Sequence, residues 1–334
     1  MISPISIYHI LSLTTNGAAN KTLTEMLHAL SEKSIEELNK KNSTISSLFA
    51  KFKSVELANA VFTRFNPLDD FQKMIKEYKA KLDYLKDANQ INLWCSDATH
   101  KKIPKIVDTI TGADKMVLIN AIYFNGIWQE PFDKNNTRLN AFFGSNNQIK
   151  KIMFMNSTKN FDYFEDEGLQ AISLNYTKDN LNALIILPKN KSNINNYIRN
   201  FTSEKYNMII GNLTNKKVQL SLPKFEFDFS TELSQNFKTL GMKDAFTGNA
   251  DFSIMKKEKD IYISSIIHKT YIKVNEKGTE AAAATAIVMR CKSALPPEPI
   301  LVMKVDHPFL FVIRNNDLQL GNDMIFISKV ESLK

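Results

Sequence analysis

Apolar residues along the first 110 positions recur three and four residues apart, which is the spacing of one helix face. The pattern predicts helices over 6–15, 20–30, 35–52, 68–80 and 91–107. We expect Asn42 to interrupt the third helix and Pro104 to bend or end the last one. Residues 57–62 alternate in the manner of a strand.

The pattern changes at residue 116. Residues 116–124 form a nearly continuous apolar run whose length and β-branched content suit a strand buried on both faces. Further strands are predicted over 184–187, 217–222, 271–275, 309–313 and 324–330, with helices near 192–201 and 231–240. Helices first, then strands with a few helices, indicate an α+β fold with a large mixed sheet. The 334 residues show no repeat and no long linker.

One segment stands apart, residues 276–289, which read Glu-Lys-Gly-Thr-Glu-Ala-Ala-Ala-Ala-Thr-Ala-Ile-Val-Met. Small side chains are what a segment needs if it must leave one environment and enter a crowded one. Gly278 has the backbone freedom that a pivot requires. The run leads to Arg290-Cys291-Lys292-Ser293, a site that a trypsin-like protease can cut, and then to a proline cluster. The pattern therefore predicts a moving part.

Two conformations are compatible with this segment. Alanine has the best helix propensity, so composition alone favours a helix over 280–289. The preceding strand-like run and the following prolines favour an extended, exposed segment. As a strand it would carry both charges, Glu280 and Arg290, on one face. The other face is mostly small and apolar and could enter a core: Thr279, Ala281, Ala283, Thr285, Ile287, Met289 and Cys291.

Composition and charge add little that is specific. The chain is 43% apolar and 23% charged, so it can bury a sizeable core. Its net charge of +8 lies on scattered lysines. The local clusters are Lys101, Lys102 and Lys105; Lys150 and Lys151; Lys216 and Lys217; and Lys256, Lys257 and Lys259. Clustered positive charge attracts polyanions, so a heparin-like glycan is a candidate partner, and solvated surface lysines are the alternative.

Export and membrane signals are absent from the sequence. No run of about 18 apolar residues occurs, so no transmembrane helix and no membrane partner are expected. The first six residues lack the basic start and apolar stretch of a secretory signal. We expect the protein to be cytoplasmic, or secreted by a leader that this chain does not contain. Cys95 and Cys291 lie in different contexts, and both are expected to be free.

The residues offer no catalytic constellation. The ten glycines form no phosphate-cradling loop, and no His/Cys group has the spacing of a metal site. A thiol protease would have to combine Cys291 with His268 or His307, but the sequence signatures of catalytic cysteines are missing. We therefore expect no enzyme activity, no metal and no cofactor.

Several motifs, in the right order over nearly the whole chain, resemble the serpin family of serine protease inhibitors. The residues that carry the resemblance are Ser3-Pro4-Ile5-Ser6-Ile7, Ile91-Asn92-Leu93-Trp94, Asn120 to Trp128, Leu222-Pro223-Lys224-Phe225, His268-Lys269-Thr270, Asn275 to Ala283, and Asp306 to Phe311. The family's usual first helix is missing. The resemblance implies a single domain over 1–334 with a large, mainly antiparallel central sheet A, sheets B and C, about eight helices and a reactive-centre loop over about 276–300.

The resemblance also implies roles for particular residues. The hinge of the loop would comprise Glu276, Gly278, Thr279, Ala281, Ala282, Ala283 and Ala284. The breach, where loop insertion starts, would comprise Trp128, Lys224 and Glu276, with an ion pair expected between Lys224 and Glu276. The shutter, a polar cluster beneath the sheet where its strands part, would comprise Ser3, Ser6, Asn120 and His268.

The function implied by the resemblance is suicide inhibition of a serine protease by a metastable fold. The protease, trypsin-like or a lysine-tolerant chymotrypsin-like enzyme, would attack Lys292–Ser293, sixteen positions after Glu276. Arg290 is the competing site. Residues 278–291 would then insert into sheet A as an extra strand and trap the protease as a covalent complex. A monomer is expected.

The alternative is a non-inhibitory serpin that acts as a carrier or storage protein. Such members typically have bulky or charged residues, or proline, in the hinge. Here Thr279 and Ala281 to Ala284 are small, which favours inhibition.

Overall fold

The computed structural model describes residues 1–145, 148–190, 194–279, 299–316 and 324–333. Contacts between Cα atoms divide the chain into two compact units. The helical unit comprises residues 2–123 and 228–271, and the sheet unit comprises residue 1, 124–227 and 272–334. The chain enters and leaves each unit more than once, so the division does not follow a linker. The single domain over 1–334 stays a prediction.

The helical unit begins with three helices and then alternates strands with helices. Its elements are α1 (Pro4–Thr15), α2 (Asn20–Ala29), α3 (Ile35–Lys51), β1 (Val55–Thr63), α4 (Asp69–Glu77), β2 (Lys81–Tyr84), α5 (Ala88–Ala98), β3 (Met116–Phe124), α8 (Ser234–Thr239), the short 3-10 helix η3 (Asp244–Phe246) and most of β11 (Ile263–Asn275). The strand order is β2-β1-β3-β11.

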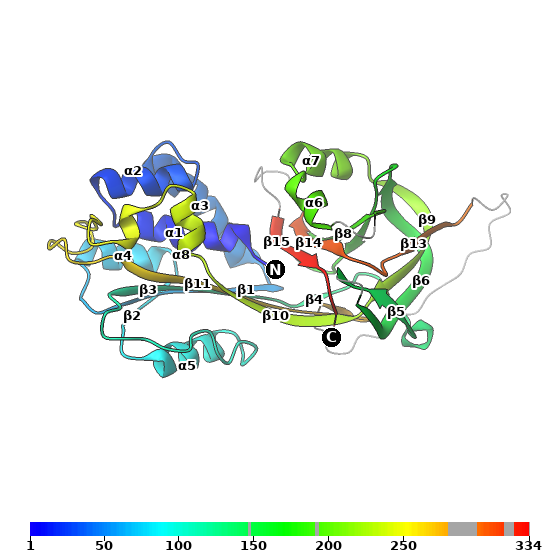
Figure 1. Ribbon diagram of the computed structural model, residues 1–334, viewed down its shortest axis with the longest axis horizontal. Coiled ribbons are helices and arrows are strands. Elements are labelled where there is room, and N and C mark those ends of the chain that lie inside the picture. Colours follow the sequence, from blue (N-terminus) through cyan, green and yellow to red (C-terminus); the bar gives the residue numbers. More distant parts are fainter. Residues whose placement is uncertain (146–147, 191–193, 280–298, 317–323, 334) are drawn as a thin grey trace. The chain divides into compact units, whose positions relative to one another are not determined.

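Strand β3 is buried along its whole length, as its apolar run predicts. Alternate residues enter two different cores. Met116 and Leu118 pack with residues of α1 and α4, whereas Val117 and Ile119 pack with residues of α5. Figure 1 shows α1 and α3 on one side of these strands and α5 on the other. A strand covered on both faces has no solvent-facing positions, which explains why its sequence does not alternate.

Two expectations for the helices are wrong. Helix α3 runs unbroken from Ile35 to Lys51 because Asn42 is accommodated inside it, almost fully buried. Helix α5 ends at Ala98, well before Pro104. The side chain of Asn92 accepts hydrogen bonds from the backbone N–H groups of Ile106 and Val107. The chain after α5 therefore folds back along the helix as a loop instead of extending it.

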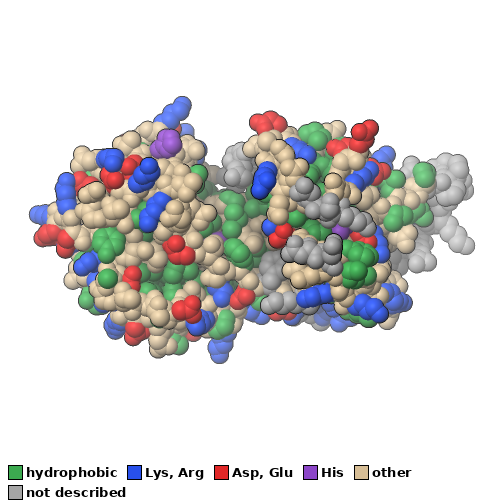
Figure 2. All heavy atoms as spheres, viewed as in Figure 1, with side chains coloured by type: hydrophobic (Ala, Val, Ile, Leu, Met, Phe, Trp, Pro, Cys, Tyr) green, Lys and Arg blue, Asp and Glu red, His purple; other side chains and the backbone are tan. Residues whose placement is uncertain are grey.

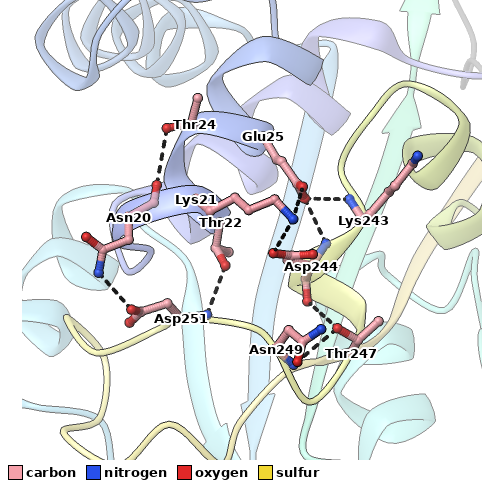
Figure 3. Close-up of polar contacts among 10 residues, drawn as sticks. All are labelled: Asn20, Lys21, Thr22, Thr24, Glu25, Lys243, Asp244, Thr247, Asn249 and Asp251. Carbon is pink, nitrogen blue, oxygen red and sulfur yellow. Dashed lines mark hydrogen bonds and ion pairs between the residues drawn. The ribbon is translucent and has the colours of Figure 1, made fainter.

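A polar network joins α2 to the segment that follows α8 (Figure 3). Glu25 Oε2 accepts hydrogen bonds from the backbone N–H groups of Lys243 and Asp244, at 2.8 and 2.7 Å. Asn20 Nδ2 donates to Asp251 Oδ2 at 2.9 Å, and Lys21 forms an ion pair with Asp244 at 2.9 Å. Residues more than 200 positions apart in sequence are thus held together within this unit.

The sheet unit contains most of the remaining strands. They are β4 (Gly126–Ile127), β5 (Arg138–Phe143), β6 (Ile149–Glu165), β7 (Leu169–Asn175), β8 (Leu181–Pro188), β9 (Thr214–Pro223), the start of β10 (Phe225–Glu232), β12 (Gly278–Thr279), β13 (Leu301–Lys304), β14 (Phe309–Asn315) and β15 (Met324–Val330). Its helices are η1 (Lys134–Asn136), α6 (Ile194–Arg199) and α7 (Ser203–Gly211). Both α6 and α7 pack on β8 and β14, around Leu184, Ile186 and Leu310.

The α+β class and its eight α-helices are present in the described part of the chain, as predicted. The sheet that contains β3 is mixed, as the order of elements predicts, because β1 pairs with β2 and β3 with β11 in parallel, whereas β12 pairs antiparallel with β11 and β4. One detail of the sheets differs. The expected second and third sheets form one hydrogen-bonded path, β13-β9-β6-β7-β8-β14-β15, with β5 paired to β6. The 17-residue strand β6 joins them because it pairs with β5, β7 and β9.

Candidate functional site

The hinge begins as a two-residue strand, β12, in the sheet unit. β12 pairs antiparallel with the end of β11 and also antiparallel with β4. Gly278 has a φ of +151°, and a Cβ there would lie 2.1 Å from the carbonyl oxygen of Gly126. Only glycine fits both the backbone angle and the space. Gly278 and Thr279, the residues of the hinge that form β12, are therefore already held between two strands.

Thr279 is fully buried beside a pair of stacked aromatic rings. Its hydroxyl lies 2.7 Å from the hydroxyl of Tyr176. The ring of Tyr176 stacks on that of Trp128, with centroids 4.5 Å apart, and Trp128 Nε1 donates to the carbonyl oxygen of Asn275 at 2.9 Å. Trp128 thus stabilises β12 indirectly, through its hydrogen bond to the end of β11, the strand that precedes β12.

Glu276 is buried, and two side chains contact its carboxylate. Lys224 Nζ lies 3.0 Å from Oε1 and 2.9 Å from Oε2. Thr137 Oγ1 donates to Oε1 at 2.9 Å. Burial by itself raises the pKa of Glu276, but the hydrogen bonds from Lys224 and Thr137 outweigh it and hold the pKa below its usual value. The expected ion pair is present and is more buried than an ordinary surface pair.

Sequence reasoning missed three residues of this hinge cluster: Gly126, Thr137 and Tyr176. Gly126 lies inside the motif that ends at Trp128, so its proximity to the hinge could have been inferred. Thr137 and Tyr176 have no such signal, because they lie in separate segments 139 and 103 residues from their partners Glu276 and Thr279.

The shutter residues meet in the helical unit around Asn120, on β3. Asn120 Oδ1 accepts from Ser6 Oγ at 2.9 Å and from His268 Nδ1 at 2.6 Å. His268 Nε2 accepts the backbone N–H of Ser3 at 3.1 Å, so the ring is neutral with its proton on Nδ1. Burial lowers the pKa of His268 to about 3, which agrees with a neutral ring. Ser3 contributes its backbone, and its hydroxyl has no partner among the described residues.

Two further residues, both missed from sequence, extend this cluster. Asn120 Nδ2 donates to Asn59 Oδ1 at 2.6 Å, on β1. Asn59 Nδ2 lies 3.0 Å from His9 Nδ1, on α1. Burial also lowers the pKa of His9, to about 4. The extended shutter therefore runs from β11 through β3 and β1 to α1, entirely through hydrogen-bonded side chains.

The predicted reactive bond lies outside the described residues. So do Ala281 to Ala284, Arg290, Cys291, Lys292 and Ser293. Cys95 is free and buried, and burial raises the pKa of its thiol to about 12. His307 is held by Asp306 Oδ1 and by the carbonyl oxygen of Pro188, each at 2.8 Å. The described ranges contain no group of three His, Cys, Asp or Glu side chains placed to hold a metal ion.

Comparison with known proteins agrees with this arrangement. The family model described as "Serpin (serine protease inhibitor)" matches residues 1–333. The chain belongs to the serpin family.

This serpin is 33% identical to the leukocyte elastase inhibitor of Xenopus laevis, over 94% of the chain and 88% of that relative. The native-state structure of tengpin, a thermophilic serpin, is 34% identical with a TM-score of 0.89, and the match covers 99% of this chain and 88% of tengpin. Human thyroxine-binding globulin, 23% identical with a TM-score of 0.87, shares the fold over all of this chain and 91% of its own. The predicted serpin fold is confirmed.

The sheet of this serpin is closed where the shutter lies. Strands β3 and β11 pair directly from Met116 to Tyr123 and from Ile263 to Tyr271, and Asn120 lies opposite His268 in the register. No other described strand separates these two. Parting them would break both the backbone ladder and the shutter hydrogen bonds, so these bonds stabilise the closed sheet.

Proposed function

We propose that this serpin inhibits a trypsin-like or lysine-tolerant chymotrypsin-like serine protease as a suicide substrate, without catalytic activity of its own. The observation that carries the proposal is which strands are paired at the hinge and in the sheet. β12 already occupies the space between β11 and β4, while β3 and β11 remain paired to each other. A strand that continued β12 would run antiparallel to β11, and β3 runs parallel to β11. It would therefore be antiparallel to both of its new neighbours.

The covalent step takes place at Lys292–Ser293. The serine oxygen of the protease attacks the carbonyl carbon of Lys292 and forms an ester. The amide bond to Ser293 breaks, and the new amino terminus takes the proton. The freed segment 278–291 then enters between β3 and β11 before water hydrolyses the ester. Arg290 is the competing site.

Insertion is favourable because it replaces one hydrogen-bonded ladder with two. Each additional backbone hydrogen bond contributes about 1 kcal/mol net. The small apolar face from Thr279 to Cys291 adds hydrophobic burial at about 25 cal/mol per Å². Over about a dozen residues, the total is comparable with the ~5–15 kcal/mol stability of an ordinary domain. That energy is the driving force for trapping the protease.

The decisive experiment is incubation with trypsin, followed by a denaturing gel and mass spectrometry. We expect a covalent complex, together with a released fragment that begins at Ser293. The variant Lys292→Ala should lose inhibition of trypsin-like enzymes. Inhibition that survives in this variant would show that the register is wrong, and a fragment that begins at Cys291 would assign the cut to Arg290.

The rival function is that of a carrier or storage serpin. Thyroxine-binding globulin, whose structure was solved with thyroxine, has this fold, but a likeness at 23% identity transfers the fold alone. Clean cleavage by trypsin with no covalent complex would support the rival. The small residues of the hinge favour inhibition.

A polyanion partner is a weaker proposal. On the face shown in Figure 2, Lys and Arg side chains occur at many separate places among acidic groups. Lys105 pairs with Asp108 at 2.7 Å, and Lys256 pairs with Asp260 at 2.6 Å, so these two clusters are partly neutralised. Within the described ranges no helix is long and apolar enough to span a membrane. The monomeric state stays a prediction.

A further inference from the structure

A hollow in the sheet unit lies where β6 separates from β7. The two strands stay paired as far as Asp162 on β6 and Ser173 on β7. Beyond that point the segment before η1 lies beside β7 instead, and Gln129 donates its backbone N–H to the carbonyl oxygen of Asn175 at 2.8 Å. The hollow at this fork has a volume of about 170 Å³. Of the breach, hinge and shutter residues that the structure describes, only Trp128 lines it.

Ser173 is the buried polar residue of the hollow. It is only 7% exposed, and its hydroxyl has no hydrogen-bond partner among the described residues. The hydroxyl oxygen is not among the fully enclosed atoms that lack a partner, and Ser173 lines the hollow, so the hydroxyl opens into it. A buried hydroxyl without a protein partner is unfavourable unless water or a ligand bonds to it. The hollow therefore contains a binding group that the fold itself does not use.

Asp162 lies beside Ser173 and is equally unpaired. In the strand register Asp162 is opposite Ser173 on β7 and opposite Asn215 on β9. Residues opposite one another in antiparallel strands share a face, so these three side chains form a row across the sheet. The carboxylate of Asp162 forms no ion pair and no hydrogen bond with any described residue. A carboxylate in this state accepts hydrogen bonds from whatever enters the hollow.

The other polar walls are mostly carboxamides. None of these side chains forms a hydrogen bond with another described residue: Gln129, Asn160, Asn175 and Asn215. Lys159 and Glu130 also line the hollow, but they pair with each other at 2.9 Å, so their charges offset. Asp162 therefore supplies the only uncompensated charge on the described walls.

These walls define the chemistry of a ligand. Asp162 only accepts hydrogen bonds, whereas the carboxamides and the hydroxyl of Ser173 both donate and accept. Asp162 would repel an anion, and a cation that only donates would leave the carboxamide N–H groups without acceptors. Hydroxyl groups match every wall, because each hydroxyl donates and accepts. The volume is below the roughly 300–1,000 Å³ of a site for a drug-sized ligand. We propose that this hollow binds one ring of a neutral sugar.

The segment that closes the hollow also contacts the residues before β12. The backbone N–H of Trp128 donates to the carbonyl oxygen of Lys277 at 3.0 Å, and that of Phe132 donates to the carbonyl oxygen of Glu276 at 2.8 Å. A sugar that bonds to Gln129 and to β7 at once would hold this segment in place. The effect on strand insertion rests on the proposed function, whereas sugar binding does not.

A fluorescence titration of the full chain tests the site. The sequence contains two tryptophans, so Trp94→Phe leaves Trp128, which lines the hollow, as the only reporter. The probes are glucose, galactose and mannose, with glucuronate as an anionic counterpart of the same ring shape. We expect at least one neutral sugar to give a saturable change, and glucuronate to bind at least about tenfold more weakly because of Asp162. No saturable change with any neutral sugar, or tighter binding of glucuronate, would overturn the proposal.

Two variants assign the binding to these side chains. Ser173→Ala and Asp162→Ala should each weaken binding of the sugar at least about tenfold. The matched controls are Thr158→Ala, at an exposed position of β6, and Glu167→Ala, in the exposed turn before β7. Neither control residue lines the hollow, and both variants should bind as the parent does. Unchanged affinity in both Ser173→Ala and Asp162→Ala would show that the hollow holds only water and would overturn the proposal.

Stability and hydrogen exchange give independent readouts. Ser173→Ala loses no protein partner, so its melting temperature without sugar should not fall. A fall would show that the hydroxyl bonds within the protein and would contradict its role. Bound sugar should slow hydrogen exchange of the backbone amides of Trp128 and Gln129, and unchanged exchange would refute the contact with this segment.

The methyl glycoside of the sugar that binds best distinguishes two sources. Its anomeric oxygen is capped as in a glycan, so retained binding identifies the end of a glycan chain and lost binding identifies a free sugar. All these measurements are made without a protease. Failure to trap trypsin would therefore refute the proposed function and leave the sugar site intact.

Discussion

At the scale of single residues, the described positions that are predicted to be functional are ones where a buried polar group has defined partners. Glu276 is buried with Lys224 and Thr137, Thr279 with Tyr176, and His268 with Asn120. Each of these groups would be unfavourable in the interior without its partner. Substitutions that change charge or size there should therefore alter the proposed strand insertion more than they alter local packing.

Thr279→Arg tests the insertion face. Thr279 is fully buried in the native hinge, and an arginine there places an unpaired charge in the interior, which costs several kcal/mol. We expect the variant to be cleaved by trypsin at Lys292 but to form little covalent complex. Thr279→Val, which keeps shape without charge, is the control. An unchanged yield of complex in Thr279→Arg would contradict the assignment of this face.

The two shutter histidines predict a dependence of stability on pH. Their pKa values are lowered from 6.5 to about 4 for His9 and about 3 for His268, whereas the unfolded chain titrates near 6.5. Above pH 6.5 both states are neutral and the stabilisation is complete. As pH falls from 6.5 towards 4 only the unfolded state takes up protons, so stability is lost at up to about 1.4 kcal/mol per pH unit for each histidine. Urea unfolding at pH 7.5, 6 and 5 measures the slope, and His268→Gln should reduce it. An identical slope in His268→Gln would mean that His268 does not remain neutral in the folded protein.

At the scale of elements, the shortest strand matters most. β12 has two residues, yet it pairs with strands on both sides. Its geometry depends on one glycine against another, Gly278 against Gly126. Such a strand is a starting point for a longer one, because the direction and register of any continuation are already set.

Gly278→Ala should expel β12 from its place. The added methyl would lie 2.1 Å from the Gly126 oxygen, on a backbone angle that alanine rarely adopts. In Gly278→Ala we expect the backbone amides of 274–279 to exchange hydrogen faster than in the parent protein. We also expect a change in the fluorescence of Trp128, which contacts this segment. Gly112→Ala is the control, because a Cβ at Gly112 meets nothing within 4 Å. Retained protection in Gly278→Ala would show that β12 does not need the glycine.

At the scale of the whole molecule, the proposed function requires that the closed pairing of β3 with β11 is not the most stable state available to the chain. If a further strand can be added, the chain gains a second ladder without losing its existing core. The native fold would then persist because the shutter hydrogen bonds and the uncut loop prevent the strands from parting.

Cleavage of the loop should therefore stabilise the protein. After limited proteolysis at Lys292, we expect the melting temperature to rise by tens of degrees. Insertion would add several kcal/mol to the free energy of unfolding, and each kcal/mol raises the midpoint by a few degrees. Calorimetry of intact and nicked samples makes the measurement, and nicked Thr279→Arg should show a smaller rise. An unchanged melting temperature after nicking would remove the basis of the proposed mechanism.

Much of this architecture follows from local pattern. The apolar run at 116–124 predicts a strand buried on both faces, and the helices α1 to α4 follow from apolar spacing. The errors occur where tertiary contacts decide. Asn42 does not break α3, because its side chain is buried and the helix continues to Lys51. Helix α5 stops at Ala98, where the side chain of Asn92 binds the backbone of the following loop. The short strands β2 and β13 have too few residues to show a period, and both are edge strands set by their neighbours.

The sequence by itself determined the family, and it predicted the small-residue hinge and the polar residues of the breach and shutter, because these depend on residue type in a fixed order along the chain. Only the tertiary structure decided that Tyr176 and Thr137 contact the predicted hinge residues, and that Asn59 and His9 join the predicted shutter residues. Those relations join segments tens to more than a hundred residues apart. Hydrogen bonds act over about 3 Å in space and leave no periodic mark along the chain.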